Sequence, residues 1–224
     1  MDVRDAVATR YSCRAFLSTP VPIEIVRDIL ERAARAPSGG NVQPWLVHAI
    51  AGERLEALKA QLRPRFAKEL PRGEGSEYHI YPPDLKEPYY GRRARVGNQL
   101  YSSLGIPRED KVARYRQFSR NYLLYDAPVG LFFSMDRSMG PPQWSDVGGL
   151  LQTIMLLARA HGLHTCAQEA WTNFHKTMSP FLRLPPEHIL FCGIALGYAD
   201  ETAPINGWRS EREPVDAFTT FDGF

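Results

Sequence analysis

Apolar residues recur along the chain at two spacings, which predict short helices and short strands. Repeats of three and four residues, typical of one face of a helix, lie in 2–9, 26–36, 55–62, 144–160 and 174–182. Continuous apolar runs of strand length lie at 46–51, 128–135, 163–167 and 189–198. The 144–160 helix is apolar on nearly every side, which indicates that it is buried.

Residues 63–125 have a different character. Their apolar periodicity is weak, and they hold eight tyrosines between Tyr78 and Tyr125 together with several prolines. We predict helices around 89–104 and 108–120 that lie over the core rather than in it. After about residue 200 the chain carries charged and aromatic residues without periodicity, which predicts an extended arm.

These elements follow one another without a strict strand–helix–strand rhythm, so the predicted fold class is α+β. We expect one small mixed or antiparallel sheet flanked by helices, with the 144–160 helix buried at the centre. The chain is expected to form a single domain over 1–224. An inserted cap or lid at about 63–125 and a C-terminal arm at about 200–224 complete the prediction.

Composition excludes several classes of protein. The 224 residues carry a formal net charge of +2, which gives no reason to expect a nucleic-acid partner. Cys13, Cys166 and Cys192 are an odd, sparse set that does not suggest a disulfide framework. No apolar run approaches the roughly 18 residues of a membrane span, and the charged N-terminus lacks the apolar segment of a signal peptide. We therefore expect a cytoplasmic protein without membrane contact.

Several nucleotide-binding and catalytic motifs are missing. The sequence has no G-x-G-x-x-G, no P-loop and no C-x-x-C, and Ser38 lacks the G-x-S-x-G context of a nucleophile. His161 and His164 have no evident third ligand, which favours surface histidines over a zinc site, so no metal is expected. The run Arg92-Arg93-Ala94-Arg95 is either a phosphate patch or a solvated helix face, and the small net charge favours the latter.

The segment 10–16 places two guanidinium groups and a hydroxyl within five residues. In an extended segment Arg10, Ser12 and Arg14 point the same way, because side chains alternate with a period of two. They could converge on one anion such as a phosphate, whose oxygens match the planar fork of arginine. A cluster of surface salt bridges is the alternative.

Two further segments are informative only in combination with the first. In 36–45, two glycines allow close backbone approach, and the neighbouring hydroxyl and amide side chains could pair with the edge of a planar heterocycle. A turn that satisfies its own backbone explains the same residues. The apolar strand 192–200 leads to Arg209 and Arg212, which are either further cations for an anion site or solvent-exposed charges.

Taken in register, the motifs resemble one known family. They are R-x-S-x-R-x-F from Arg10, A-P-S-x-x-N-x-Q-P-W from Ala36, G-I-A-L-G-Y-x-D from Gly193 and R-x-P from Arg212. Their order and spacing are similar to those of the FMN-dependent nitroreductases over essentially the whole chain, apart from 63–125. The resemblance implies a nitroreductase-like fold and a tight, intertwined homodimer with two FMN sites at the interface.

The resemblance also implies the residues that hold FMN. The phosphate, ribityl chain and ring edge are assigned to Arg10, Tyr11, Ser12, Arg14, Arg209 and Arg212. A loop that reaches the flavin of the partner subunit is assigned to Pro37, Ser38, Gly39 and Asn41. The strand backbone near flavin N5 is assigned to Gln168 and Glu169. Many relatives have a glycine beside the acidic residue there and a lysine at Ser210, so this chain departs from the family at both places.

The implied activity is that of an NAD(P)H oxidoreductase with a ping-pong mechanism. Hydride passes through flavin N5 to a small aromatic acceptor such as a nitroarene or quinone, so no side chain needs to be a nucleophile or obligatory base. One alternative is a flavin-dependent dehalogenase or dehydrogenase of a small metabolite, for which Glu77, Tyr78 and Lys86 loosely resemble a substrate-clamping lid. Others are a flavin-binding protein without turnover and an interaction protein that uses its aromatic middle region.

Overall fold

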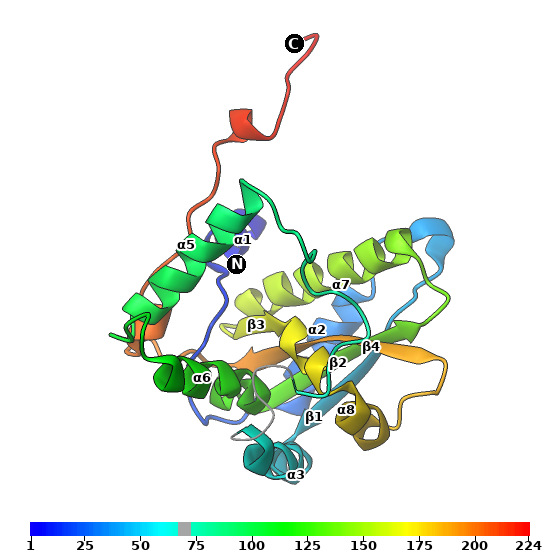
Figure 1. The fold of residues 1–224 in the computed structure, drawn as a ribbon. Coiled ribbons are helices and arrows are strands. Elements are labelled where there is room, and N and C mark those ends of the chain that lie inside the picture. Colours follow the sequence, from blue (N-terminus) through cyan, green and yellow to red (C-terminus); the bar gives the residue numbers. More distant parts are fainter. Residues whose placement is uncertain (67–72) are drawn as a thin grey trace.

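A small sheet forms the centre of the molecule (Figure 1). In the computed structural model, which describes residues 1–66 and 73–224, the sheet has four antiparallel strands in the order β1-β2-β4-β3. The strands are β1 Leu46–Ala51, β2 Val129–Asp136, β3 His164–Gln168 and β4 His188–Gly197. Each coincides with a predicted apolar run to within one residue at either end, and the antiparallel form of the predicted sheet is confirmed.

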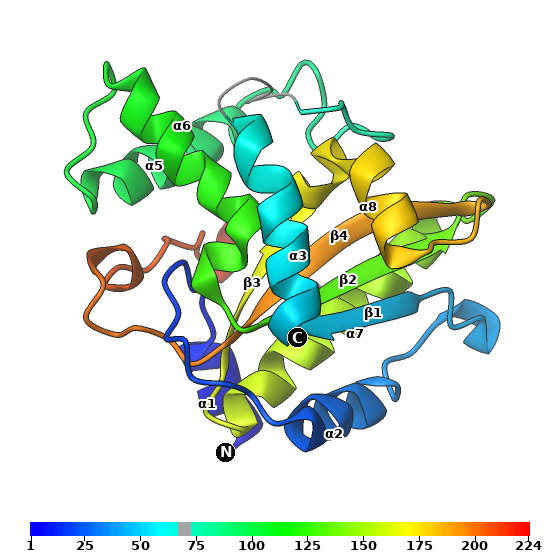
Figure 2. The same cartoon turned by 90° about the horizontal axis from the view of Figure 1, so that it is seen from below.

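Helices cover both faces of the sheet, which confirms the α+β class (Figure 2). α2 (Ile23–Ala33) and α7 (Pro141–Ala160) pack on one face, while α3 (Gly52–Leu62) and α8 (His175–Leu182) pack on the other. α1 (Val3–Thr9) lies against α7. The short 3-10 helices of the described residues are η1 Gly39–Asn41, η2 Arg63–Arg65, η3 Arg120–Asp126, η4 Glu169–Asn173, η5 Pro204–Asn206 and η6 Val215–Ala217.

Strand β2 supplies side chains to a hydrophobic cluster on each face. Leu131 and Phe133 join the cluster with α2 and α7, whereas Phe132 joins the cluster with α3 and α8. All three side chains are fully buried. Successive residues of a strand point to opposite faces, so a strand covered on both sides is a continuous apolar run.

The middle region forms two helices beside this core, as predicted: α5 (Tyr89–Ser102) and α6 (Lys111–Ser119). Residues 67–72 of the expected 63–125 cap lie outside the described residues. The expectation that the whole region lies over the core is wrong at its C-terminal end. Tyr122, Leu124 and Tyr125 are fully or almost fully buried, because η3 packs them against the aromatic cluster around Trp171.

Two smaller details differ from the sequence pattern. The apolar positions of the predicted 2–9 helix are only partly buried: Ala6 is buried, whereas Val3 and Val7 are 65% and 56% exposed. Helix α2 ends at Ala33 rather than near Ala36. In the described part of the chain, no helix combines the length and the apolar content that a membrane span requires.

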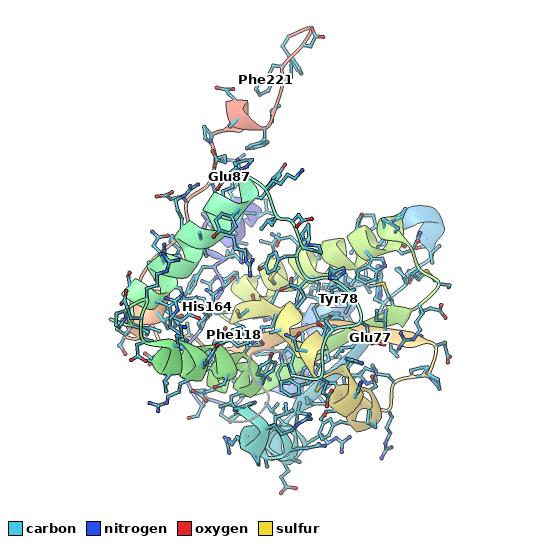
Figure 3. The ribbon with its side chains drawn as sticks, in the orientation of Figure 1. Glu77, Tyr78, Glu87, Phe118, His164 and Phe221 are labelled. Atoms are coloured by element: carbon cyan, nitrogen blue, oxygen red, sulfur yellow. The ribbon has the colours of Figure 1, made fainter. Side chains whose placement is uncertain are left out.

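The C-terminal segment leaves the body of the protein and ends far from the sheet (Figure 1). Phe221 lies on this projecting part (Figure 3). Phe218, Phe221 and Phe224 are 73%, 59% and 107% exposed, so the segment carries large apolar side chains that the described part of the chain leaves mostly uncovered.

Gly193 of β4 provides a test of how tightly the sheet packs. A Cβ atom at Gly193 would lie 2.7 Å from Cδ1 of Trp171 and 3.2 Å from Cδ1 of Phe132, and both rings are fully buried. We expect Gly193→Ala to lower the free energy of unfolding by about 1–3 kcal/mol, the usual cost of overpacking, in urea titrations. Ile194→Val, which only shortens a neighbouring side chain, should cost about 0.5–1.5 kcal/mol. A Gly193→Ala protein as stable as wild type would contradict this packing.

Candidate functional site

The extended segment after α1 runs along the outer edge of β3. Ser12 forms a parallel bridge with Thr165, and the Cys13 amide donates a hydrogen bond to the Thr165 carbonyl at 2.9 Å. Further along, Phe16 pairs with Ala199. Because the segment is extended, it presents alternate side chains to one side, as predicted for Arg10, Ser12 and Arg14.

A cavity of about 500 Å³ opens beside this segment. It brings together polar side chains from both ends of the chain, namely Arg10, Ser12, Arg14, Arg209, Ser210 and Arg212. Tyr11 also lines it, together with Val96 from α5 and Gln152 from α7. The structure therefore unites the two groups of arginines that are about 200 residues apart in sequence, and none of the described lining residues carries a carboxylate.

Asn206 joins the two ends of the chain behind the cavity. Its side-chain oxygen accepts a hydrogen bond from the Arg14 amide at 2.9 Å, and its side-chain nitrogen donates to the carbonyls of Ala15 and Asp200, both at 2.8 Å. The Asn206 carbonyl in turn accepts a hydrogen bond from Nη1 of Arg209 at 2.8 Å. Asn206 is 4% exposed, so one buried amide fixes both walls of the site.

The cavity is strongly electropositive. The pKa of Arg10 is lowered by burial and then by the nearby charge of Arg212. Within the described residues no ion pair involves Arg10 or Arg212, and Nη1 of Arg212 donates instead to Oγ of Ser210 at 2.7 Å. Two like charges held together without a carboxylate favour an anion between them, because it would relieve their repulsion.

A stack of side chains supports the cavity from behind. The Arg209 guanidinium lies 3.7 Å from the centre of the Tyr11 ring, and Tyr11 packs on His164 with 5.2 Å between ring centres. Nη1 of Arg159 lies 3.2 Å from Nδ1 of His164, which accepts a hydrogen bond from it when the ring is neutral. The pKa of His164 is lowered to about 4, first by burial and then by Arg159 and Arg209. His164 is 7% exposed, so the expectation that it is a surface histidine is wrong.

Arg14 is held by a buried tyrosine from the middle region. The Arg14 guanidinium lies beside the Tyr125 hydroxyl, and its Nη1 donates to the Ser12 carbonyl at 3.2 Å. The Phe16 amide donates to the Tyr125 carbonyl at 3.3 Å. Leu124, Tyr125 and Asp126 all have positive φ angles, of 54°, 52° and 72°. Non-glycine residues rarely adopt this conformation, so the fold maintains local strain where it positions Arg14.

The predicted partner-facing loop lies outside this cavity. Ser38, Gly39 and Asn41 are at the N-terminal end of α7, where the Gly39 amide donates to Oδ2 of Asp146 at 3.2 Å. The Gln43 amide donates to Oγ of Ser38 at 3.0 Å, so the loop satisfies part of its own backbone. Pro37 and Asn41 are exposed to solvent. A single chain thus does not bring this loop to the arginines.

Gln168 and Glu169 lie where β3 ends and η4 begins. The Gln168 amide nitrogen donates to the carbonyl of Asn121 at 2.8 Å, and its oxygen accepts from Nε1 of Trp171 at 3.3 Å. Its side chain is therefore engaged inside the fold and is not available to a ligand. Glu169 is exposed.

None of the three cysteine thiols has the exposure or the lowered pKa that a nucleophile needs. The cysteines are free and buried. The pKa of Cys13 is raised to about 12, chiefly by burial, even though it lies between two arginine-bearing positions. Cys13 therefore remains a protonated thiol at neutral pH. Among the described residues, no group of three His, Cys, Asp or Glu side chains is placed to hold a metal ion.

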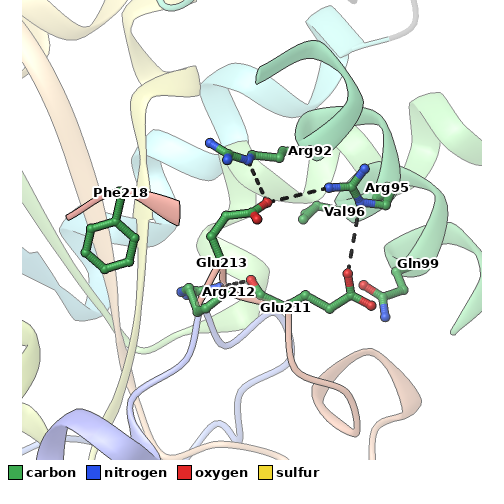
Figure 4. A pocket seen from close by; sticks show the side chains of 8 residues that line it. All are labelled: Arg92, Arg95, Val96, Gln99, Glu211, Arg212, Glu213 and Phe218. Atoms are coloured by element: carbon green, nitrogen blue, oxygen red, sulfur yellow. Dashed lines mark hydrogen bonds and ion pairs between the residues drawn. The ribbon is translucent and has the colours of Figure 1, made fainter. Parts of the chain in front are cut away.

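A second cavity, of about 740 Å³, adjoins the first and shares Val96 and Arg212 with it (Figure 4). It lies between α5 and the C-terminal arm. Nε of Arg92 lies 2.9 Å from Oε1 of Glu213, and Arg95 lies 4.0 Å from both Glu211 and Glu213. These ion pairs fasten the arm that carries Arg212 to α5.

Sequence reasoning found the arginines but missed the residues that position them. Asn206, Tyr125 and His164 are typical neither of a motif nor of a periodic pattern. The only signal for Asn206 was an amide in a segment otherwise rich in charge and aromatics, and nothing distinguished Tyr125 from the other tyrosines of its region.

A small antiparallel sheet covered by helices, with an arginine-lined cavity at its edge, defines the class as an α+β protein. Comparison with known proteins gives the family: the model of the Nitroreductase family matches residues 7–198, so the chain belongs to the nitroreductase family. A nitrobenzene nitroreductase of Ectopseudomonas oleovorans is 38% identical over 98% of this chain and 96% of its own length.

Solved structures of the family are also similar over the full chain. An FMN and NADPH-dependent nitroreductase, NfnB, from Sphigopyxis sp. strain HMH is 44% identical, with a TM-score of 0.96 and full coverage of both chains. NfnB from Mycobacterium smegmatis, solved in complex with NADPH, is 29% identical with a TM-score of 0.91, covering 99% of this chain and 100% of its own. The predicted nitroreductase-like fold is confirmed.

The buried His164 makes stability depend on pH in a defined window. Its folded pKa of about 4 lies below the ordinary histidine value of 6.5, so the unfolded chain takes up the proton first as the pH falls. The contribution of His164 to the free energy of unfolding is therefore fully present above about pH 6.5 and is lost as the pH falls towards 4. At pH 5 the loss from this group is at most about 2 kcal/mol. Urea titrations at pH 7, 6 and 5 measure the decline.

His164→Asn is the matched control, because an asparagine keeps an acceptor for Arg159 but does not titrate. We expect the decline between pH 7 and pH 5 to be smaller in this variant. His48, whose pKa is also lowered by burial, contributes equally to both proteins. Identical pH profiles for the variant and wild type would mean that His164 is protonated in the folded protein.

Proposed function

We propose that this chain is an FMN-dependent NAD(P)H oxidoreductase that reduces nitroaromatic compounds, quinones or similar small aromatic acceptors. The observation that carries the proposal is the convergence of Arg10 and Arg212 from opposite ends of the chain on one cavity without a carboxylate. Membership of the nitroreductase family and the names of the relatives support it, since they describe FMN and NADPH-dependent reduction of nitro compounds.

The residues of the cavity fit the chemical groups of FMN. Arg10 and Arg212 repel each other and would neutralise a phosphate dianion, and Ser210 adds a hydroxyl beside Arg212. Ser12, Arg14 and Arg209 offer donors to the polyhydroxylated chain and ring edge. Trp208, another lining residue, has an indole N–H that is buried without a partner among the described residues. This set consists almost entirely of donors and suits an anionic, oxygen-rich ligand.

The proposed roles leave the redox step to the cofactor. A bound FMN would supply the hydride-transfer chemistry between NAD(P)H and the acceptor. Arg10 and Arg212 would bind its phosphate, and Arg14, which lies beside Tyr125, would orient the ring. Because Cys13 is a buried, protonated thiol, the proposal needs no side-chain nucleophile.

The structure gives little support to the dehalogenase alternative. That interpretation uses Glu77, Tyr78 and Lys86 as a substrate-clamping lid. The Glu77 carboxylate instead pairs with Arg137 at 2.8 Å, and the Tyr78 hydroxyl donates to the carbonyl of Phe191. Tyr78 also packs edge-on against Trp144, so both residues are committed to the fold.

We further propose that the protein is a cytoplasmic homodimer with both flavins at its interface. Loop 37–41 lies outside the cavity of its own chain, so it is available to the flavin of the partner. The projecting arm has uncovered aromatic side chains that a partner would bury. Residues 63–125 would cap the site within a single domain, with α5 already lining the cavity through Val96. The three free cysteines suit a reducing compartment.

The direct test of the proposed function is flavin reduction in anaerobic stopped flow. We expect the protein to purify yellow with one FMN for each chain, to bleach on addition of NADPH or NADH and to regain its colour with a nitroarene. A bound flavin that neither nucleotide bleaches would indicate a binding protein without turnover. A colourless protein that takes up no FMN would overturn the proposal.

Arg212→Gln tests the phosphate contact. Loss of a charge-assisted hydrogen bond costs about 1.5–3 kcal/mol, which predicts roughly ten- to a hundredfold weaker FMN binding by fluorescence titration. Arg116→Gln is the matched control, because Arg116 is exposed on α6 and does not line the cavity. Equal FMN affinity of Arg212→Gln and wild type would remove Arg212 from the site.

The arm provides a separate test of the dimer. Truncation after Pro214 keeps Asn206, Arg212 and Glu213 but removes the exposed Phe218, Phe221 and Phe224. We expect the truncated protein to shift towards monomer in analytical ultracentrifugation, because stable obligate interfaces typically bury more than about 2,000 Å² and the arm's aromatic surface would be lost. An unchanged dimer would show that the arm does not hold the subunits together.

A further inference from the structure

Helix α5 divides its arginine run between two environments. Arg92 and Arg95 face the C-terminal arm, where each has a glutamate partner (Figure 4). Arg93 faces the other side of the helix, towards α6. The sequence left two interpretations of the run 92–95, a phosphate patch or a solvated helix face. Because the arginines lie in different environments, each of them has to be considered separately.

The second environment is a groove of about 440 Å³ between α5 and α6. Its polar lining consists of Tyr90, Arg93, Asn98, Arg108 and Arg114, with Ala94 and Gly97 as small residues between them. Positions 90, 93, 94, 97 and 98 form one stripe of the helix, since they recur every three or four residues. A Cβ atom added at Gly97 would meet nothing within 4 Å, so the glycine leaves the groove open.

Among the described residues that line the groove, none is acidic. Within residues 1–66 and 73–224, Arg93, Arg108 and Arg114 take part in no ion pair, in contrast to Arg92 and Arg95 on the opposite face. Three guanidinium groups therefore converge in a protein whose net charge is only +2.

Two of the three guanidinium groups are held in fixed orientations. Cζ of Arg93 lies 4.0 Å from the centre of the Tyr81 ring, and Cζ of Arg114 lies 3.7 Å from the centre of the Tyr101 ring. Stacking of this kind occupies the face of the guanidinium plane and leaves the N–H donors at its edge free. A fork that is already oriented loses less conformational entropy when it binds an anion.

We propose that this groove is a second anion site, which binds the phosphate groups of a nucleotide-like ligand. Arginine forks match phosphate oxygens in pairs, Asn98 adds an amide, and the exposed ring of Tyr90 offers a face for a heterocycle. The site is distinct from the cofactor cavity, because the two are lined by opposite faces of α5: Val96 lines one, while Arg93 and Gly97 line the other.

The phosphate has two possible sources. One is the adenosine end of NADPH, whose 2′-phosphate NADH lacks; this source rests on the proposed function. The other is a free phosphorylated compound that binds independently of turnover. Both require the same arginines, and the two arms of the experiment below separate them.

The first arm measures binding to the FMN-loaded protein, in which the cofactor cavity is filled. Adenosine 2′,5′-bisphosphate and inorganic pyrophosphate are titrated calorimetrically in a phosphate-free buffer of low ionic strength. We expect saturable binding of at least one probe, weakened about tenfold or more in Arg93→Gln and in Arg114→Gln. Arg116→Gln removes one charge from α6 outside the groove and should bind as wild type does. Absence of saturable binding, or equal binding by all variants, would overturn the proposal.

The second arm measures steady-state kinetics with NADPH and with NADH. If NADPH supplies the phosphate, Arg93→Gln raises KM for NADPH about tenfold and leaves KM for NADH unchanged. If binding in the first arm is lost but both KM values stay as in wild type, the site serves a free phosphorylated ligand. If neither nucleotide bleaches the flavin in wild type, the proposed function is contradicted. The binding measurements of the first arm then decide on their own whether the groove binds anions.

Discussion

The repulsion between Arg10 and Arg212 is the constraint on which the candidate site depends. These residues come from opposite ends of the chain, and burial together with their mutual charge lowers the pKa of Arg10. Such a pair stays together only if the surrounding fold holds both backbones. The edge of β3 fixes the first segment through Thr165, and Asn206 fixes the second to it. The sheet edge, the C-terminal arm and the buried Asn206 side chain thus act together to hold Arg10 and Arg212 close despite their repulsion.

The same arrangement explains why the positioning residues are more buried than the arginines that they position. Asn206, Tyr125 and His164 are each at most 7% exposed. A buried polar group needs its partners fully supplied, so its geometry is narrowly defined. The arginines remain partly open to the cavity and keep donors for a ligand. The buried residues behind the cavity therefore fix the positions of the arginines, and the arginines that line the cavity supply its positive charge.

The sequence predicted the sheet well because its strands are continuous apolar runs, a local property visible without any contact map. The arginines of 10–14 and 209–212 were also found, because motifs of fixed spacing carry them. What local reasoning could not find depends on contacts across the fold. Asn206 acts on Arg14 over 192 residues of sequence. The role of Tyr125 depends on its strained backbone conformation and on its hydroxyl beside Arg14. His164 resembled a surface residue in the sequence, but the structure places two arginines and a tyrosine around it.

The separation of Arg10 from Arg212 along the chain has a consequence for the order of events during biosynthesis. Arg10 is made about 200 residues before Arg212, so a growing chain has only half of the cavity until translation has passed Arg212. A phosphate-bearing cofactor therefore cannot act as a template for the early strands. β1, β2 and η3 are all translated before Arg212, so any structure that they form on the ribosome forms without the complete cavity. Loading is a late step, and the stability of the empty protein sets how long a newly made molecule can wait for its cofactor.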